Sequence, residues 1–120
     1  MKNTNQIRQG DLLLVKIAEP KWLDKALRLT PNRHGKIVLA QGESTLHEHT
    51  IDAADAEAFA FVETVLHVKS SAATLKTTHI HTGRPLPRHT PQDLGGGYYR
   101  VVHQRELSMA DLRRAVVVRD

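Results

Sequence analysis

The apolar residues of this chain come in short runs, each closed by glycine, proline or polar turn residues. The segments 12–17 and 36–40 are apolar runs of strand length between turn signals, a pattern typical of buried β-strands. Further extended segments are expected at 44–51, 59–68, 73–80, 97–107 and, as a terminal strand or ordered tail, 115–118. Only 20–29 and 108–114 have the apolar spacing or the capping residue of a short helix. The sequence therefore predicts a mostly β fold, a small β-barrel or sandwich with one or two short helices.

One segment interrupts this pattern, because 81–97 carries three prolines and four glycines. Such a composition predicts a long irregular loop, and long loops in compact domains are often functional.

The size and composition of the chain limit its class. Its 120 residues fit one domain, 1–120, and the absence of cysteine excludes disulfides and thiolate metal sites. No apolar run approaches the roughly 18–20 residues that span a bilayer, and the N-terminal residues are polar. We therefore expect a cytoplasmic protein with no membrane partner.

The formal net charge of +4 permits weak association with nucleic acid. However, lysine and arginine are scattered along the chain, with no run of five and no alternation with aromatic residues. A solvated surface is the simpler interpretation of these charges. The sequence leaves open a small-molecule or protein partner and a homodimer.

Histidine provides the strongest chemical signal, with eight residues in the chain. His47 and His49 are two residues apart in a segment that alternates like a strand, so both side chains should lie on one face. Two imidazoles so placed can bind one ion, with nitrogen–metal distances of about 2.0–2.1 Å. Neutral imidazole suits zinc, iron, nickel and copper. The pattern predicts a divalent transition metal, with Zn, Fe, Ni and Mn as candidates.

One or two further ligands are expected from residues elsewhere in the chain. The candidates are His89 in the loop, His103 in the late strand, His81 and the carboxylate of Asp52. A carboxylate joining two histidines would favour non-haem iron. The last prediction from the histidines is that His47 and His49 point inward and share their site with at least one histidine of the second half.

Other interpretations of the same residues remain. His79 and His81 form a second His-x-His, but at a strand end where exposed histidines are common, and His103 also fits a core histidine with a hydrogen-bond partner. Glu48 and Thr50 alternate with the histidines and are expected to face solvent. No Gly-x-Ser-x-Gly nucleophile motif and no phosphate-binding glycine loop is present.

The segment Gly42-Glu43-Ser44-Thr45-Leu46-His47-Glu48-His49 resembles the first metal motif of the cupin superfamily, in which a glycine precedes a His-x-His on a barrel strand. The resemblance implies a cupin-like barrel with a metal bound by His47 and His49. The acidic residue of that motif has no match at the expected spacing, because Asp52 comes early and Asp55 late. The second cupin motif is not matched.

A broader resemblance covers nearly the whole chain. The segments 8–15, 38–49 and 97–106 look like those of an uncharacterised family of small bacterial and phage or plasmid proteins. Members of that family have glycine where this chain has Leu46. This resemblance implies no activity.

Two functions from different classes therefore stand beside each other. One is a small cupin-like metal-binding protein, in which an open coordination position would let the metal activate water or a small oxygen-bearing ligand. Whether it is an enzyme is left open by the sequence. The other is a non-catalytic β scaffold that binds a protein or nucleic-acid partner and whose histidines are structural.

Overall fold

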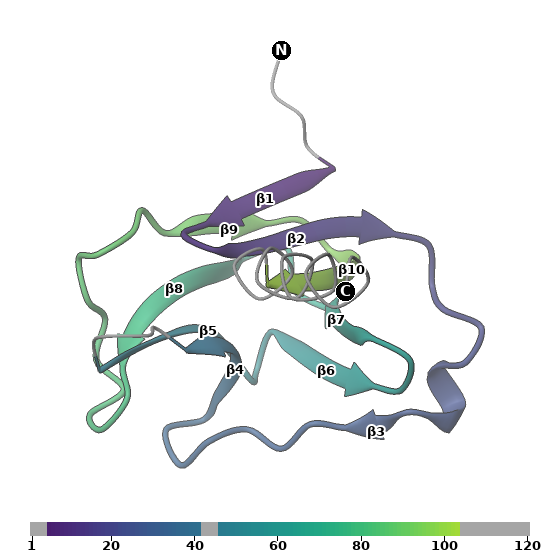
Figure 1. Cartoon of the computed structure of the whole chain (residues 1–120), viewed down its shortest axis with the longest axis horizontal. Coiled ribbons are helices and arrows are strands. Elements are labelled where there is room, and N and C mark those ends of the chain that lie inside the picture. Colours follow the sequence, from purple (N-terminus) through teal and green to yellow (C-terminus); the bar gives the residue numbers. More distant parts are fainter. Residues whose placement is uncertain (1–4, 42–45, 104–120) are drawn as a thin grey trace, which may run out of the picture.

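The computed structural model describes residues 5–41 and 46–103, and within them the chain is built almost entirely of antiparallel strands (Figure 1). The elements in chain order are β1 (Gln6–Gln9), β2 (Leu12–Ile17), the 3-10 helix η1 (Leu23–Lys25), β3 (Leu27–Arg28), β4 (Lys36–Gln41), β5 (His47–Asp52), β6 (Ala56–Ala60), β7 (Thr64–Val68), β8 (Ala73–His79), β9 (Gln92–Leu94) and β10 (Gly97–His103).

These strands form two sheets. One has six strands in the order β1-β2-β10-β7-β6-β3, and the other has four in the order β4-β5-β8-β9. Every pairing within them is antiparallel. The prediction of a mostly β fold is confirmed. The described strands do not close into a single barrel, so the barrel that the sequence offered as one option is not formed by this part of the chain.

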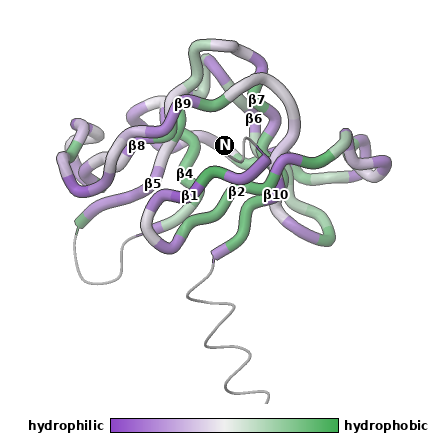
Figure 2. The backbone as a smooth tube through the Cα atoms, turned by 90° about the horizontal axis from the view of Figure 1, so that it is seen from above, coloured by the Kyte–Doolittle hydropathy of each residue, from purple (hydrophilic) through white to green (hydrophobic). Residues whose placement is uncertain are grey.

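The core consists of aliphatic side chains contributed by both sheets, as the scarcity of aromatic residues requires. Apolar residues recur along β2 and β4, coloured green in Figure 2. The buried cluster contains Leu12, Leu14, Ile37, Leu39, Ile51, Ala56, Ala58, Leu66, Val68, Ala73, Leu75, Leu94, Tyr99 and Val101. Tyr99 is the one aromatic residue among them, and its hydroxyl donates a hydrogen bond of 2.7 Å to the carbonyl of Gly95. That bond satisfies the only polar group that the ring brings into the core.

The helix expected at 20–29 is not formed. Only the single turn η1 lies there, followed at once by β3, in which Leu27 pairs with Ala60 and Arg28 with Phe59. The amide of Leu29 then donates to the carbonyl of Ala58 at 2.8 Å. The first turn of a helix fixes several residues for a single hydrogen bond, which is unfavourable in so short a segment. The segment therefore forms strand hydrogen bonds to β6 instead of a helix. The other expected helix, 108–114, and the expected terminal strand, 115–118, lie outside the described residues.

Two further expectations need correction. The segment 59–68, expected as one strand, is a hairpin in which β6 turns at Phe61–Glu63 into β7, with Ala60 opposite Thr64. No glycine or proline marks that turn, so the sequence pattern does not show it. The loop 81–97 contains β9, which pairs with β8 and buries Leu94 in the core.

Within 5–41 and 46–103, no helix has the length and apolar character needed to cross a membrane.

Candidate metal centre

β5 places two histidines in the interior of the protein. It lies between β4 and β8 in the four-stranded sheet. Alternation along the strand puts His47, His49 and Ile51 on one face, and Ile51 belongs to the core. His47 and His49 are only 6% and 5% exposed, and their ring centroids are 5.4 Å apart. The expected inward orientation of the His-x-His is therefore present.

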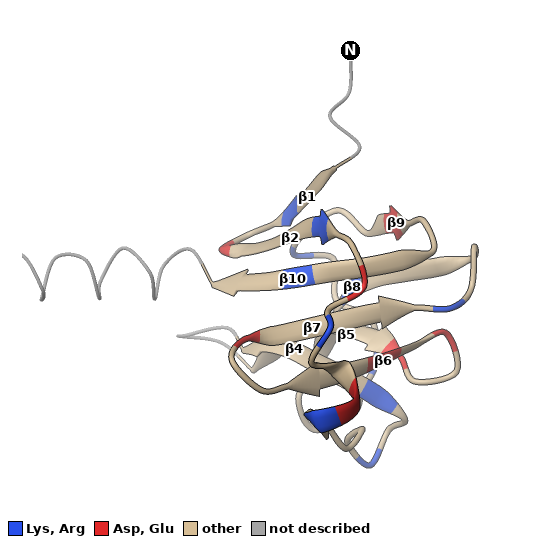
Figure 3. Cartoon of the chain, turned by 90° about the vertical axis from the view of Figure 1, so that its right-hand side faces the viewer, with Lys and Arg blue, Asp and Glu red and all other residues tan. Residues whose placement is uncertain are grey.

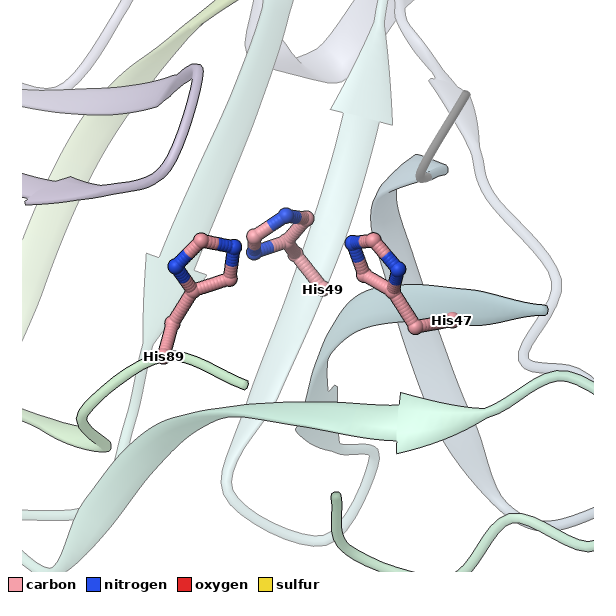
Figure 4. Close-up of side chains that lie close together, drawn as sticks. All are labelled: His47, His49 and His89. Carbon is pink, nitrogen blue, oxygen red and sulfur yellow. The ribbon is translucent and has the colours of Figure 1, made fainter. Parts of the chain in front are cut away.

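His89, from the segment that precedes β9, completes a cluster of three imidazoles. Its ring centroid lies 5.3 Å from that of His49 and 6.0 Å from that of His47. One ring nitrogen from each histidine lies within 4.8 Å of the other two, and the three rings converge in Figure 4. We refer to His47, His49 and His89 as the histidine cluster. It meets the expectation that a histidine from the second half joins the pair.

The other candidate ligands do not belong to the histidine cluster. Asp52 is on the opposite face of β5 from Ile51 and forms ion pairs with Lys36 and Lys76. The Nε2 atom of His103 is 2.6 Å from the carbonyl oxygen of Leu39. Both groups already have protein partners, and neither belongs to the histidine cluster.

The second His-x-His forms a turn. The Nδ1 atom of His79 accepts hydrogen bonds from the amides of His81 and Thr82 at 3.1 and 3.3 Å. The ring of His81 is exposed and lies 5.6 Å from that of His79. The structure therefore does not bring His81 to the histidine cluster.

Gln9, at the end of β1, is the residue of this site that the sequence analysis missed. The residue is 2% exposed, and its side-chain amide nitrogen donates to the carbonyls of Leu75 and Thr90 at 3.1 and 3.0 Å. Its amide oxygen lies 2.8 Å from Nδ1 of His49. Since that oxygen can only accept, Nδ1 of His49 must carry the proton. The lone pair of His49 is then on Nε2.

Gly10 brings the backbone of the β1–β2 turn close to the same rings. It occupies the first of the two turn positions between Gln9 and Leu12 with φ +60°, as a type II′ turn requires. A Cβ atom at this position would lie 3.0 Å from Nε2 of His89 and 3.3 Å from Cε1 of His49. The positive φ favours glycine here, and a Cβ atom would press on the rings of His89 and His49.

The environment of His47 and His49 favours the neutral form of both imidazoles. Burial, followed by the neighbouring His89 and His47, lowers the pKa of His49 to about 4. Burial, followed by the charge of Arg88 and then by His89, also lowers the pKa of His47 from its usual value. At neutral pH both imidazoles therefore retain a lone pair, which is the form that binds a metal.

The outer face of β5 differs from expectation, because Glu48 and Thr50 are buried rather than exposed to solvent. Each has a polar partner. The side-chain amide of Gln41 donates to the carboxylate of Glu48 at 3.2 Å, and the hydroxyls of Thr50 and Thr78 lie 2.9 Å apart. Polar side chains with partners can be buried, so alternation of polar and apolar residues alone does not predict exposure.

Fold and site together define a small antiparallel β protein with a cluster of three histidines, two of which are buried. The chain belongs to the family described as Domain of unknown function (DUF8820), whose model matches residues 8–104. The matched region contains the whole histidine cluster together with Gln9 and Gly10. No curated protein and no solved structure matches the chain.

Proposed function

We propose that the protein binds one divalent transition metal ion through His47, His49 and His89. The observation that carries this proposal is the convergence of three ring nitrogens within 4.8 Å of one another. Nitrogens that share a tetrahedral ion at bonds of about 2.0–2.1 Å lie about 3.3 Å apart. The rings therefore need to approach one another by an ångström or so, which small side-chain rotations provide.

The surroundings of the cluster support this proposal. Histidines that bind metals usually donate their other ring N–H to a protein oxygen, which fixes the tautomer and the orientation of the ring. The hydrogen bond from His49 to Gln9 has this form. In addition, His47 and His49 need not lose a proton before they bind an ion, since burial keeps the pKa of each below its usual value.

The donor set favours some metals over others. Three neutral imidazoles without a carboxylate suit zinc, nickel, copper or iron, whereas manganese prefers oxygen donors. Zinc is the ion we expect from this set. Among the candidates drawn from the sequence, manganese fits least well.

Three protein ligands leave the fourth position of a tetrahedral ion open, as in catalytic zinc sites. An ion held in this way lowers the pKa of bound water and can polarise an oxygen-bearing substrate. The proposal therefore extends to metal-dependent chemistry on a small substrate. It also retains the cupin-like interpretation of the His-x-His, for which the support is the position of His47 and His49 on an inward-facing strand of an antiparallel sheet.

Calorimetric titration of untagged, chelator-treated protein with Zn²⁺ tests the proposal. We expect one ion per chain in the wild type and a large loss of affinity in His47→Ala, His49→Ala and His89→Ala. His67→Ala is the matched control, because His67 stacks on Tyr98 at a ring distance of 4.2 Å and is not part of the cluster. If the wild type takes up no zinc, nickel, copper or iron, or if all four variants bind as the wild type does, the metal site is wrong.

A second candidate function is a protein-binding module. Exposed apolar side chains lie near β3 and the β6–β7 turn, where Leu27, Phe61 and Val62 are 76%, 57% and 79% exposed. The ring of Trp22 lies 5.7 Å from that of Phe61. Large exposed apolar side chains that lie together often mark a site of protein interaction. A protein partner together with the absence of bound metal would favour this function.

The charges favour a nucleic-acid partner less. Basic and acidic positions are interspersed along the ribbon in Figure 3. Several basic side chains form ion pairs: Arg28 and Lys69 with Glu57, Lys36 and Lys76 with Asp52, and Arg100 with Glu63. A basic surface that binds phosphates would be expected to concentrate its charge on one face.

A further inference from the structure

Thr77 of β8 lies directly opposite His49 in the pairing of β5 with β8. The carbonyl of Thr77 accepts a hydrogen bond from the amide of Leu86, and the amide of His79 donates to the carbonyl of Arg84. The main-chain groups of Thr77 and His79 therefore turn away from β5. His49 and Thr77 then form a non-hydrogen-bonded pair, the type in which facing side chains approach most closely. The side chain of Thr77 thus lies on the same face as the histidine cluster.

The hydroxyl of Thr77 has no hydrogen-bond partner within 5–41 and 46–103. Thr77 is 2% exposed, and among the described residues its Oγ1 is the one buried side-chain nitrogen or oxygen without a partner. The neighbouring Thr78 is different, because its hydroxyl meets that of Thr50 on the outer face of the sheet. Buried hydroxyls are rarely left unsatisfied, since the cost of removing them from water is then not recovered.

Charge indicates the kind of ligand that would satisfy this hydroxyl. The three imidazoles are neutral ligands, so an ion bound by them keeps its full double positive charge in a partly buried site. Arg88 acts on His47 with a positive charge and Asp11 acts on His49 with a negative one, so these two charges offset each other and the charge of the ion remains. A net positive, partly closed site favours an anion in the remaining coordination position.

We propose that the hydroxyl of Thr77 donates a hydrogen bond to a small oxygen-donor anion, of carboxylate size and chemistry, that occupies the coordination position left open by His47, His49 and His89. This inference rests on the proposed metal site. It adds a residue that selects the exogenous ligand without binding the ion itself.

The test uses the Co²⁺-loaded full chain, titrated with formate and followed by visible absorption, which reports both the ion and its fourth ligand. The variants are Thr77→Val, which removes the hydroxyl at constant shape, Thr77→Ser, which keeps it, and Thr77→Ala. Thr74→Val is the control, because Thr74 lies in the same strand on the other face and contacts Asp93.

We expect Co²⁺ affinity to be similar in all these proteins. Formate affinity should fall about tenfold or more in Thr77→Val and Thr77→Ala, as for the loss of a hydrogen bond to a charged group. It should change little in Thr77→Ser and Thr74→Val.

The outcomes separate the two proposals. If the wild type binds no Co²⁺, the metal site is wrong and the role of Thr77 is wrong with it. If Co²⁺ binds but formate leaves the spectrum unchanged, or binds equally to wild type and Thr77→Val, only the role of Thr77 is wrong. If Thr77→Val and Thr77→Ala both fail to fold or to bind Co²⁺, the hydroxyl serves the structure instead, and the inference is overturned.

Discussion

Gln9 is expected to have two separable roles, one in stability and one in the orientation of His49. Its amide nitrogen satisfies the carbonyls of Leu75 and Thr90, and its amide oxygen accepts from Nδ1 of His49. Gln9→Met keeps the volume of the side chain but removes all three hydrogen bonds. Two of the three groups left behind are buried, and each costs about 1–3 kcal/mol when unsatisfied. With a smaller contribution from Thr90, the metal-free variant should lose about 3 kcal/mol of unfolding free energy.

Gln9→Glu divides the two roles. A carboxylate still accepts the proton of His49, but it cannot donate to the two carbonyls. The metal-free protein should therefore be destabilised by both substitutions. Metal affinity should fall about 10–100-fold in Gln9→Met, as for other lost partners of metal-binding histidines, and should be largely kept in Gln9→Glu.

Urea denaturation of the metal-free proteins measures the unfolding free energy, and calorimetric titration with Zn²⁺ measures the metal affinity. Gln6→Met is the matched control, since Gln6 is an exposed residue of the same strand and should change the unfolding free energy by less than about 0.5 kcal/mol. If Gln9→Met is as stable as Gln6→Met and binds zinc with wild-type affinity, the role assigned to Gln9 is refuted.

Three further predictions follow from the site. First, burial and then the neighbouring imidazoles hold the pKa of His49 at about 4 against an ordinary 6.5, so the unfolded chain takes up the proton first, and the contribution of His49 to the unfolding free energy should be complete above pH 6.5 and fall by about 3 kcal/mol towards pH 4. The unfolding free energy, measured by denaturation at several pH values, should depend less on pH in His49→Gln, and an equally steep loss in that variant would contradict the assignment. Second, Gly10→Ala should lower the zinc affinity measured by calorimetry, because its Cβ would meet His89, whereas the control Gly35→Ala, also at positive φ but with nothing within 4 Å, should cost only about 1–2 kcal/mol of stability. If the two variants bind zinc with equal affinity, Gly10 does not limit the site. Third, Zn²⁺ at 100 times its dissociation constant should stabilise the fold by about 2.7 kcal/mol and raise the melting temperature by about 10 °C, reversibly with chelator; unchanged melting would contradict metal binding to the folded state.

The part of the site that the sequence predicts is the part carried by one strand. The period of two in β5 places His47 and His49 on one face, whatever the rest of the fold does. The same period excludes Asp52 from that face, because it lies three positions, an odd number, after His49. Asp52 was a candidate ligand only because of its nearness in sequence, which the alternation of the strand overrides.

The remainder of the site depends on contacts between residues far apart in the chain. His89 was one of several candidate ligands. It can be distinguished from the others only when the course of the segment between β8 and β9 is known. Gln9 lies 40 positions from His49 and 66 from Leu75, and no local pattern distinguishes a buried glutamine from an exposed one. The Gly10 turn was visible in the sequence, but its contact with the imidazoles was not.

The fold shows a similar division. Short apolar runs between turn residues correctly predicted strands such as β2 and β4. The helical spacing within 20–29 was misleading, because the hydrogen-bond partners of that segment come from β6, which lies some thirty residues further along the chain. The spacing of apolar residues within a segment carries no information on hydrogen-bond partners from distant strands.

The most direct test of the metal site is a crystal of the full chain grown with Zn²⁺, with diffraction recorded on both sides of the zinc absorption edge. The account predicts one anomalous peak per chain, bonded to ring nitrogens of His47, His49 and His89 at about 2.0–2.1 Å. It also predicts that His49 binds through Nε2 while Nδ1 remains hydrogen-bonded to Gln9. A fully occupied zinc ion elsewhere, with the three imidazoles free of metal, would contradict the account.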